Sequence, residues 1–299
     1  MSTPRIRGQS AGNARTGHVD APALPISMGK RSEQARPMAG QQAIRTGRYL
    51  YAVIPGSEAT SEQMGRDAGG SYGPIGIDGR DVYTILNGSV AAVVSDVPKE
   101  SIRPDRRRLA AHHEVLKLLM ARCTTLPISF GTIADNSEAV CELLSSGRDA
   151  LVEQLQRVEG KVEMGLRLSW DVPNIFQYIV STHAELRTLR DEMFRGGREP
   201  SRDDKIELGR LFDRIVNEDR VVHTETVVNI VQPRCFELRE NRLRNECEVM
   251  NLACLVGRCA QKDFEEGVFE AAKLFDDNFS FDFNGPWPPY NFVDVALRM

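Results

Sequence analysis

Two adjacent histidines and a glutamate, His112-His113-Glu114, come closest to a catalytic or metal-binding pattern in this sequence. A zinc-protease helix places its second histidine four residues after the first, so that both imidazoles reach one metal from one helical face. Here Leu116 and Lys117 occupy the positions four residues after the two histidines. We therefore interpret His113, which shares an apolar helical stripe with Leu116, as a packed core histidine. Metal-dependent hydrolysis through His112 or His113 stays as an alternative.

Other chemical motifs are also incomplete. Gly73, Gly76 and Gly79 lie three residues apart, which differs from the G-x-G-x-x-G spacing of dinucleotide-binding loops. The six cysteines form no C-x-x-C pair, and we interpret them as reduced thiols. Arginines gather at 106–108 without the interleaved aromatic residues of a nucleic-acid surface. The sequence therefore predicts no enzyme, cofactor, metal or nucleic acid. A tandem α/β module that binds a small ligand or RNA stays as a further alternative.

The composition is typical of a globular protein with a basic N-terminus. The chain has 299 residues, of which 41% are hydrophobic and 27% are charged, with a formal net charge of -4. Residues 1–46 contain seven Lys/Arg and two Asp/Glu and have no apolar period, so we expect a disordered basic tail. The longest apolar run, at 249–256, is far too short to span a membrane, and no signal peptide is recognisable. We therefore expect a cytoplasmic protein.

Residues 47–157 are expected to form an N-terminal α+β domain. Its hairpin turns at Asn87-Gly88, a dipeptide that favours the tight turn between two antiparallel strands. Strands are expected at 48–54, 81–86 and 90–95. They should be followed by a helix at 103–123, a short strand at 126–131 and a helical region at 135–157.

Residues 158–299 are expected to form a second domain. Its first strand is the clearest, because apolar and polar residues alternate from Val162 to Trp170. Its strands should lie at 162–170, 235–240, 249–256 and 279–283, and its helices at 174–195, 203–230 and 264–275. This order is βαββαβ, the ferredoxin-like pattern, with an enlarged helical excursion at 174–230.

The C-terminal stretch GPWPPYNFV combines three prolines with three aromatic residues. Proline has no backbone N–H, so this stretch must be held by side-chain packing, either internally or on a partner. We expect a terminal clasp that packs against the protein's own domains, with Trp287 as an anchor and one face left for a partner. The candidate clasp or partner-binding residues are Pro286, Trp287, Pro288, Pro289, Tyr290 and Phe292.

Six short motifs, in order along the chain, resemble the gas vesicle protein F/L family of accessory proteins. They are RYLYAVIPG, GSVAAVVSDVP, HHEVLKLLMARCTTLPISFGT, VEGKVEMGLRLSWD, EVMNLACLVGR and GPWPPYNFV. Met164 stands where tryptophan is usual in that family. Together the motifs cover about residues 48–295. The resemblance implies two α+β domains, the second a modified ferredoxin-like fold, and it brings no catalytic residue.

The resemblance also implies a function. It indicates a non-enzymatic accessory protein for gas vesicle formation that binds the small hydrophobic shell protein during nucleation or assembly, as a chaperone or a minor structural component. Other gas vesicle accessory proteins are further candidate partners, and the expected location is the cytoplasm, at the vesicle. A shell protein presents an apolar face before assembly and needs a partner to avoid aggregation. We expect the excursion at 174–230 to carry part of that partner surface.

Overall fold

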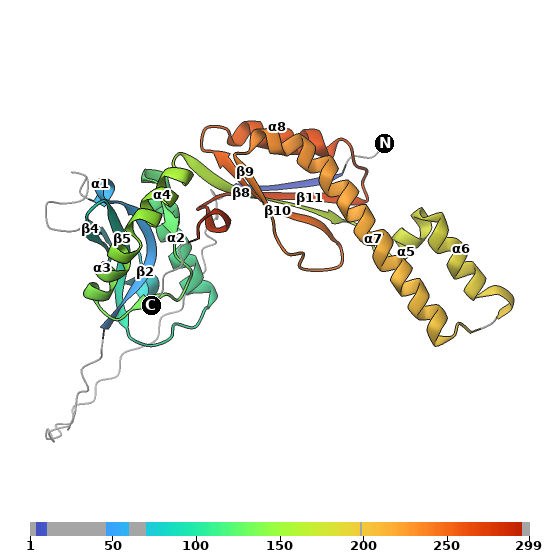
Figure 1. The fold of residues 1–299 in the computed structure, drawn as a ribbon, viewed down its shortest axis with the longest axis horizontal. Coiled ribbons are helices and arrows are strands. Elements are labelled where there is room, and N and C mark those ends of the chain that lie inside the picture. Colours follow the sequence, from blue (N-terminus) through green and yellow to red (C-terminus); the bar gives the residue numbers. More distant parts are fainter. Residues whose placement is uncertain (1–3, 11–45, 60–69, 198, 295–299) are drawn as a thin grey trace, which may run out of the picture.

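Two β-sheets with their own helices lie along the long axis of the molecule (Figure 1). The computed structural model describes residues 4–10, 46–59, 70–197 and 199–294. Helices and strands are mixed throughout, which confirms the predicted α+β class. Among the described residues, no helix is both long and apolar enough to cross a bilayer.

The first sheet is built around a buried central pair, β2 and β5. The strands lie in the order β3-β4-β5-β2-β6, and β7 also pairs with β2. The predicted hairpin at Asn87-Gly88 joins β4 to β5. The predicted strand at 126–131 is wrong in length, because the ladder stops after Pro127 and Gly131 turns the chain with a positive φ. The strands are β2 (Thr46–Pro55), β3 (Ser71–Gly73), β4 (Val82–Asn87), β5 (Val90–Pro98), β6 (Leu126–Pro127) and β7 (Ile133–Ala134).

Helices cover both faces of the first sheet. Tyr49 and Tyr51 of β2 point to one face, where they pack with helix α2. Leu50 and Val53 point to the other face, under α3 and α4. This double burial explains why β2 is apolar at almost every position. The helices are α1 (Gly56–Ala59), α2 (Arg106–Arg122), α3 (Ser137–Ser146) and α4 (Arg148–Val158), and a 3₁₀ turn spans Ile77–Gly79.

The second sheet has five strands in the order β1-β11-β8-β10-β9. Its four C-terminal strands pair antiparallel, and from β8 onward strands and helices follow one another in the predicted order. Phe279, Phe281 and Phe283 of β11 all point into the core on one face. The strands are β1 (Arg5–Ser10), β8 (Lys161–Trp170), β9 (Glu237–Glu240), β10 (Glu248–Gly257) and β11 (Phe279–Trp287).

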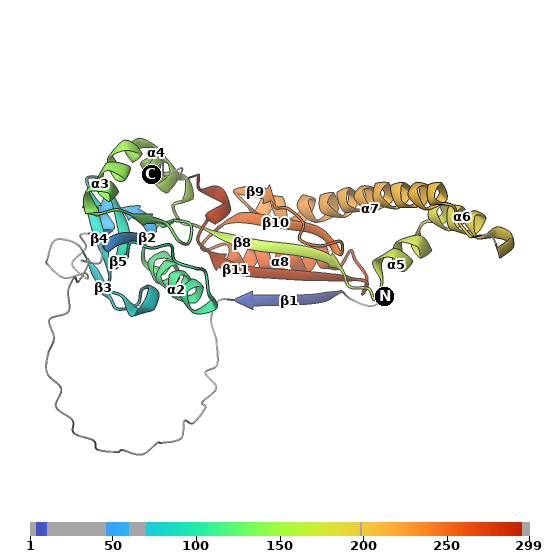
Figure 2. The same cartoon turned by 90° about the horizontal axis from the view of Figure 1, so that it is seen from below.

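Strand β1 corrects the expectation of a disordered tail at 1–46. Arg5–Ser10 pairs in parallel with β11 at the edge of the second sheet (Figure 2). The prediction failed because Ile6 is the only large apolar residue in the segment, and the backbone ladder to a distant strand leaves no local pattern. Apart from Pro4 and Thr46, the rest of the predicted tail lies outside the described residues.

Two helices, α7 and α8, cover one face of the second sheet. Helix α7 runs for 30 residues, and a capping box between Ser201 and Asp204 fixes its start. The predicted helix at 174–195 is interrupted at His183. Figure 1 shows α5, α6 and the N-terminal part of α7 extending away from the sheet. The helices are α5 (Ile175–Thr182), α6 (Ala184–Met193), α7 (Arg202–Val231) and α8 (Gln261–Ala272), with 3₁₀ turns at Arg195–Gly197, Gln232–Arg234 and Tyr290–Phe292.

Candidate functional site: the C-terminal segment and its junction with α2

The C-terminal segment, residues 286–294, begins with the last two residues of β11 and lies between the two sheets (Figure 2). Its predicted site residues differ in exposure. Pro288 and Pro289 are buried, and Phe292 is completely inaccessible, whereas Trp287 and Tyr290 each expose 36% of their surface. The deepest anchor is therefore Phe292 rather than Trp287.

Polar contacts attach the segment to the second sheet. The buried carboxylate of Glu163 on β8 accepts two hydrogen bonds from Asn291, from the backbone N at 2.8 Å and from Nδ2 at 2.6 Å. Arg239 on β9 donates to the Asn291 carbonyl at 2.5 Å, and its guanidinium lies 5.4 Å from the centre of the Phe292 ring. Burial raises the pKa of the Glu163 carboxyl, and the two bonds from Asn291 oppose that rise.

Phe292 covers part of the sheet face opposite α7 and α8. Its ring packs on Ala253 and Leu255 of β10, and these three residues form a small core of their own. The alternation of β10 therefore serves two cores, because Leu252 and Cys254 point to the helices. This explains why β10 is buried at nearly every position.

The same segment contacts the first sheet and its helices, which together are called the first unit below. The Tyr290 hydroxyl lies 3.2 Å from Nε2 of His112 on α2, and the Trp287 ring lies 6.4 Å from the ring of His113. Farther along, Gln154 of α4 exchanges two hydrogen bonds of 3.3 Å with the backbone of Asp294. One short stretch of chain therefore joins β8, β9 and β10 of the second sheet to α2 and α4 of the first unit.

His112, not His113, is the core histidine, which corrects the sequence interpretation. His112 is 1% exposed and lies on the buried stripe of α2 with Val115, Leu116 and Leu119, whereas His113 is exposed. The predicted stripe was right at Leu116 and wrong at His113, whose place on the buried side is taken by His112. The error arose because α2 faces both the sheet and the C-terminal segment, so its apolar side is wider than one sheet contact requires.

His112 sits among neutral hydroxyl groups. Its Nδ1 lies 2.8 Å from the Tyr49 hydroxyl, which also accepts a hydrogen bond from the backbone N of Gly131. Burial, together with a smaller effect of the neighbouring His113, lowers the pKa of His112 to about 4. Burial also raises the pKa values of Tyr49 and Tyr290, so both phenols stay protonated at neutral pH. The arrangement is a hydrogen-bonded contact between two parts of the chain rather than an ionised catalytic group.

The described residues contain no group of three or more His, Cys, Asp or Glu side chains placed to hold a metal ion. Both ring nitrogens of His112 face tyrosine hydroxyls, which occupy the positions that a metal would need. This geometry gives no support to the alternative of a metal-dependent hydrolase.

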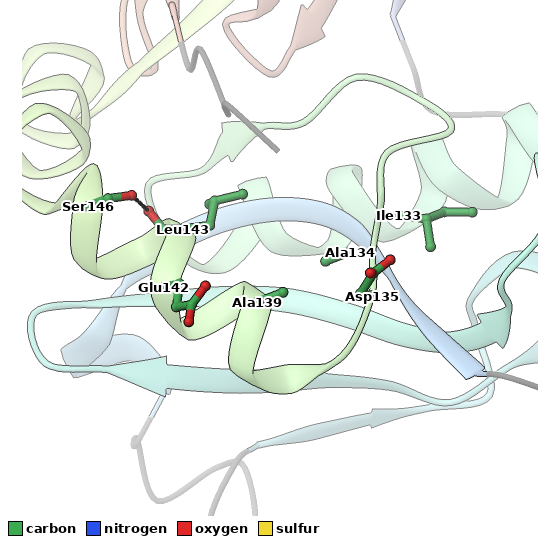
Figure 3. Close-up of a pocket in the computed structure, with 7 residues that line it drawn as sticks. All are labelled: Ile133, Ala134, Asp135, Ala139, Glu142, Leu143 and Ser146. Atoms are coloured by element: carbon green, nitrogen blue, oxygen red, sulfur yellow. Dashed lines mark hydrogen bonds between the residues drawn. The ribbon is translucent and has the colours of Figure 1, made fainter.

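A pocket lies elsewhere on the first unit, between α3 and β7 (Figure 3). Its volume is about 580 Å³. Ile133 and Leu143 give it apolar walls, and Asp135 and Glu142 add carboxylates. The hydroxyl of Ser146 donates to the Leu143 carbonyl at 3.2 Å, and none of the described residues that line the pocket is a histidine or a cysteine. Because this hydroxyl donates to a carbonyl rather than to Asp135 or Glu142, it is not placed as an activated nucleophile, and the pocket is suited to binding. Sequence reasoning missed the pocket, because its two walls come from separate elements.

Comparison with known proteins decides the family. A family model described as gas vesicle synthesis protein GvpL/GvpF matches residues 47–294. This chain belongs to the GvpL/GvpF family. The resemblance seen in the six sequence motifs is thereby confirmed, and the family match ends at the last residue of the C-terminal segment described above.

Relatives and solved structures of GvpL/GvpF proteins agree with this assignment. Gas vesicle protein F of Streptomyces sp. (strain CB03234) is 28% identical over 246 residues, covering 82% of this chain and 99% of the relative. Gas vesicle protein L of Haloferax mediterranei is 25% identical over 325 residues, covering 95% of this chain and 98% of the relative. The crystal structure of GvpF from Anabaena sp. PCC7120 superposes with a TM-score of 0.72 at 24% identity, covering 84% of this chain and 99% of that one. Its fold is therefore shared.

Proposed function

We propose that this GvpL/GvpF protein is a non-enzymatic accessory factor that binds the small hydrophobic shell protein during nucleation or assembly of the gas vesicle. Membership of a gas vesicle synthesis family supports the role in vesicle formation. The proposed place of action is the cytoplasm, at the growing vesicle. The observation that carries the binding proposal is the apolar surface of the helical excursion.

The excursion at 174–230 exposes large apolar side chains that its own core does not use. Val221 and Val222 of α7 are 57% and 59% exposed, although neighbouring Val227 is fully buried. Phe176 of α5 and Phe212 of α7 stack at a ring distance of 5.1 Å, and Phe176 remains partly open. Phe176 lies on α5 in the projecting part of the excursion, whereas Val221 and Val222 lie where α7 packs on the second sheet, beside Arg220, which donates to the Glu248 carbonyl. Apolar groups exposed at either place can contact a partner. The exposed set is Phe176, Phe194, Ile206, Val221 and Val222.

We further propose that the chain has two domains, at 47–157 and 158–299, and that the second is a modified ferredoxin-like fold. The support is the order of its strands. Numbered along the chain from β8, the four antiparallel strands lie in the order 4-1-3-2. In this interpretation, residues 174–230 replace the short first crossover of such a fold by an arm.

The C-terminal residues Pro286–Phe292 are proposed to act as an internal clasp between these domains. A structural role is supported by the two hydrogen bonds that Asn291 donates to Glu163, by the buried Phe292 and by the contact between Tyr290 and His112. Trp287 and Tyr290, each 36% exposed, are the residues of this set that are most open to a partner.

Capture of the shell protein tests the binding proposal. The double variant Val221→Glu/Val222→Glu places two negative charges on the exposed apolar face of α7, and the matched control Lys262→Glu changes the net charge by the same amount at an exposed position of α8. We expect the double variant to lose at least tenfold in affinity for refolded shell protein, equivalent to about 1.4 kcal/mol, with an unchanged circular dichroism spectrum. Equal capture by the double variant and the wild type would exclude this face of α7 as the binding surface.

A further inference from the structure

The edge of β11 is occupied by a short strand from the far end of the chain. Six residue pairs, from Arg5 opposite Ser280 to Ser10 opposite Gly285, form a parallel ladder without a register shift. Outside this ladder, the segment has few attachments. Ile6 packs partly against the core, and Arg5 forms a 3.5 Å ion pair with Asp171 between exposed side chains. Strand β1 is therefore held mainly by its backbone pairing.

The edge is nevertheless selective for sequence. A Cβ atom placed on Gly8 would lie only 2.6 Å from Cζ of the Phe283 ring. Phe269 of α8 packs edge-on against the same ring, with centroids 6.1 Å apart, and limits how far the ring can yield. Two residues earlier, Ile6 adds an aliphatic side chain to the core. The edge thus fits an extended segment in which one residue of any type separates an aliphatic residue from a following glycine.

The strand docks on one unit and is tethered to the other. Ser10 ends β1 on the second sheet, and the chain re-enters the described structure at Thr46, the start of β2 in the first sheet. Thirty-five residues lie between these two positions. A tether of that length can span at most roughly 120 Å. The family match begins only at residue 47, so β1 lies outside the part shared with the GvpL/GvpF model.

We propose that β1 is an exchangeable strand and that the edge of β11 also binds residues 4–10 of a second copy of this chain. The contacts with β11 are the same whichever copy supplies the strand, so exchange creates no new strain. Which copy supplies the strand therefore depends only on the local concentration of strands near the edge of β11. Because strand and edge belong to one chain, the strand has an effective concentration at its own edge in the millimolar range, and copies crowded together reach comparable values. Exchange therefore links copies where they gather and leaves them separate when dilute.

A peptide experiment tests whether the edge accepts the strand in trans. The full chain carrying Gly8→Leu cannot seat its own strand on Phe283 and should leave the edge open. We expect it to bind a fluorescent peptide of residues 1–10 at least about tenfold more tightly than the wild-type chain, in which the tethered strand competes. A peptide carrying the same substitution should bind neither protein. Ile6→Asp provides a second variant with a blocked strand, and Arg7→Lys, at an exposed position, should behave as the wild type.

A mixing experiment tests whether copies exchange strands. Cys259 is the exposed cysteine among the six, and two populations can be labelled there with donor and acceptor dyes. Energy transfer should rise with protein concentration, up to about 100 µM, for the wild type and Arg7→Lys, and it should be absent for Gly8→Leu and Ile6→Asp. Peptide binding without transfer between wild-type copies would limit the strand to its own chain and overturn the exchange. Transfer that persists in Gly8→Leu, or absence of peptide binding, would also overturn it.

Discussion

Truncating Phe292 should destabilise the protein more than any other change in the C-terminal segment. The ring is fully buried on Ala253 and Leu255, so Phe292→Ala removes its apolar contacts with both residues. Loss of a buried phenylalanine costs about 3–5 kcal/mol of unfolding free energy. For a folded unit of 150–250 residues, this corresponds to a fall in melting temperature of roughly 6–20 °C.

Thermal unfolding followed by circular dichroism and calorimetry measures this effect directly. Trp287→Ala is the informative comparison, because that ring is 36% exposed and its loss should cost clearly less. Phe292→Leu, which keeps most of the apolar volume, should recover much of the loss. If Phe292→Ala lowered the unfolding free energy by less than about 1 kcal/mol, the segment would not be a packed clasp and the reasoning from burial would fail.

Three further predictions concern the junction and the N-terminus. The pKa of His112 is about 4 in the folded protein and 6.5 for an unfolded imidazole, so the unfolded chain binds more protons between these values. Stability should therefore fall by about 3 kcal/mol as the pH drops from 6.5 to 4, and His112→Gln should remove this slope in chemical denaturation. A slope unchanged by the substitution would assign the effect to other groups. Glu163→Gln and Asn291→Ala should each lower the free energy of unfolding by about 1–3 kcal/mol. In a double-mutant cycle we expect a coupling energy above about 0.5 kcal/mol between the two residues. Additive losses would show that the hydrogen bonds between them contribute nothing to stability. Deletion of residues 1–45 should leave the main melting transition in place, since β1 adds little buried surface, and a collapse of that transition would contradict the weak attachment described for it.

Local patterns in the sequence were sufficient for the elements that depend on neighbouring residues. The turn at Asn87-Gly88 fixes the hairpin of β4 and β5, and strict alternation from Val162 to Trp170 marks β8. The long α7 was predicted almost to its ends, because an apolar stripe continues through it. The six motifs were sufficient to identify the family, since their order along the chain is itself informative.

Features that depend on distant parts of the chain could not be predicted. Strand β1 forms only because β11, far along the chain, offers an open edge with Phe283 beneath Gly8. Which histidine of α2 is buried depends on Tyr49, which lies 63 positions earlier, and on Tyr290 from the other end of the sequence. For the same reason, the importance of Asn291 was missed, because its partner Glu163 lies 128 positions away. Nothing in the local sequence around Asn291 distinguishes it from an exposed loop residue.

The most direct test of the account is photo-crosslinking from α7 while vesicles form. A photoreactive amino acid at position 222 should give an adduct with the shell protein in cells that assemble vesicles, identified by mass spectrometry. The same group at position 262, exposed on α8, should give little or none. An adduct at 222 but not at 262 is the predicted result. Functional protein labelled at 222 that yields no shell-protein adduct during assembly would contradict the proposal that this arm binds the shell protein.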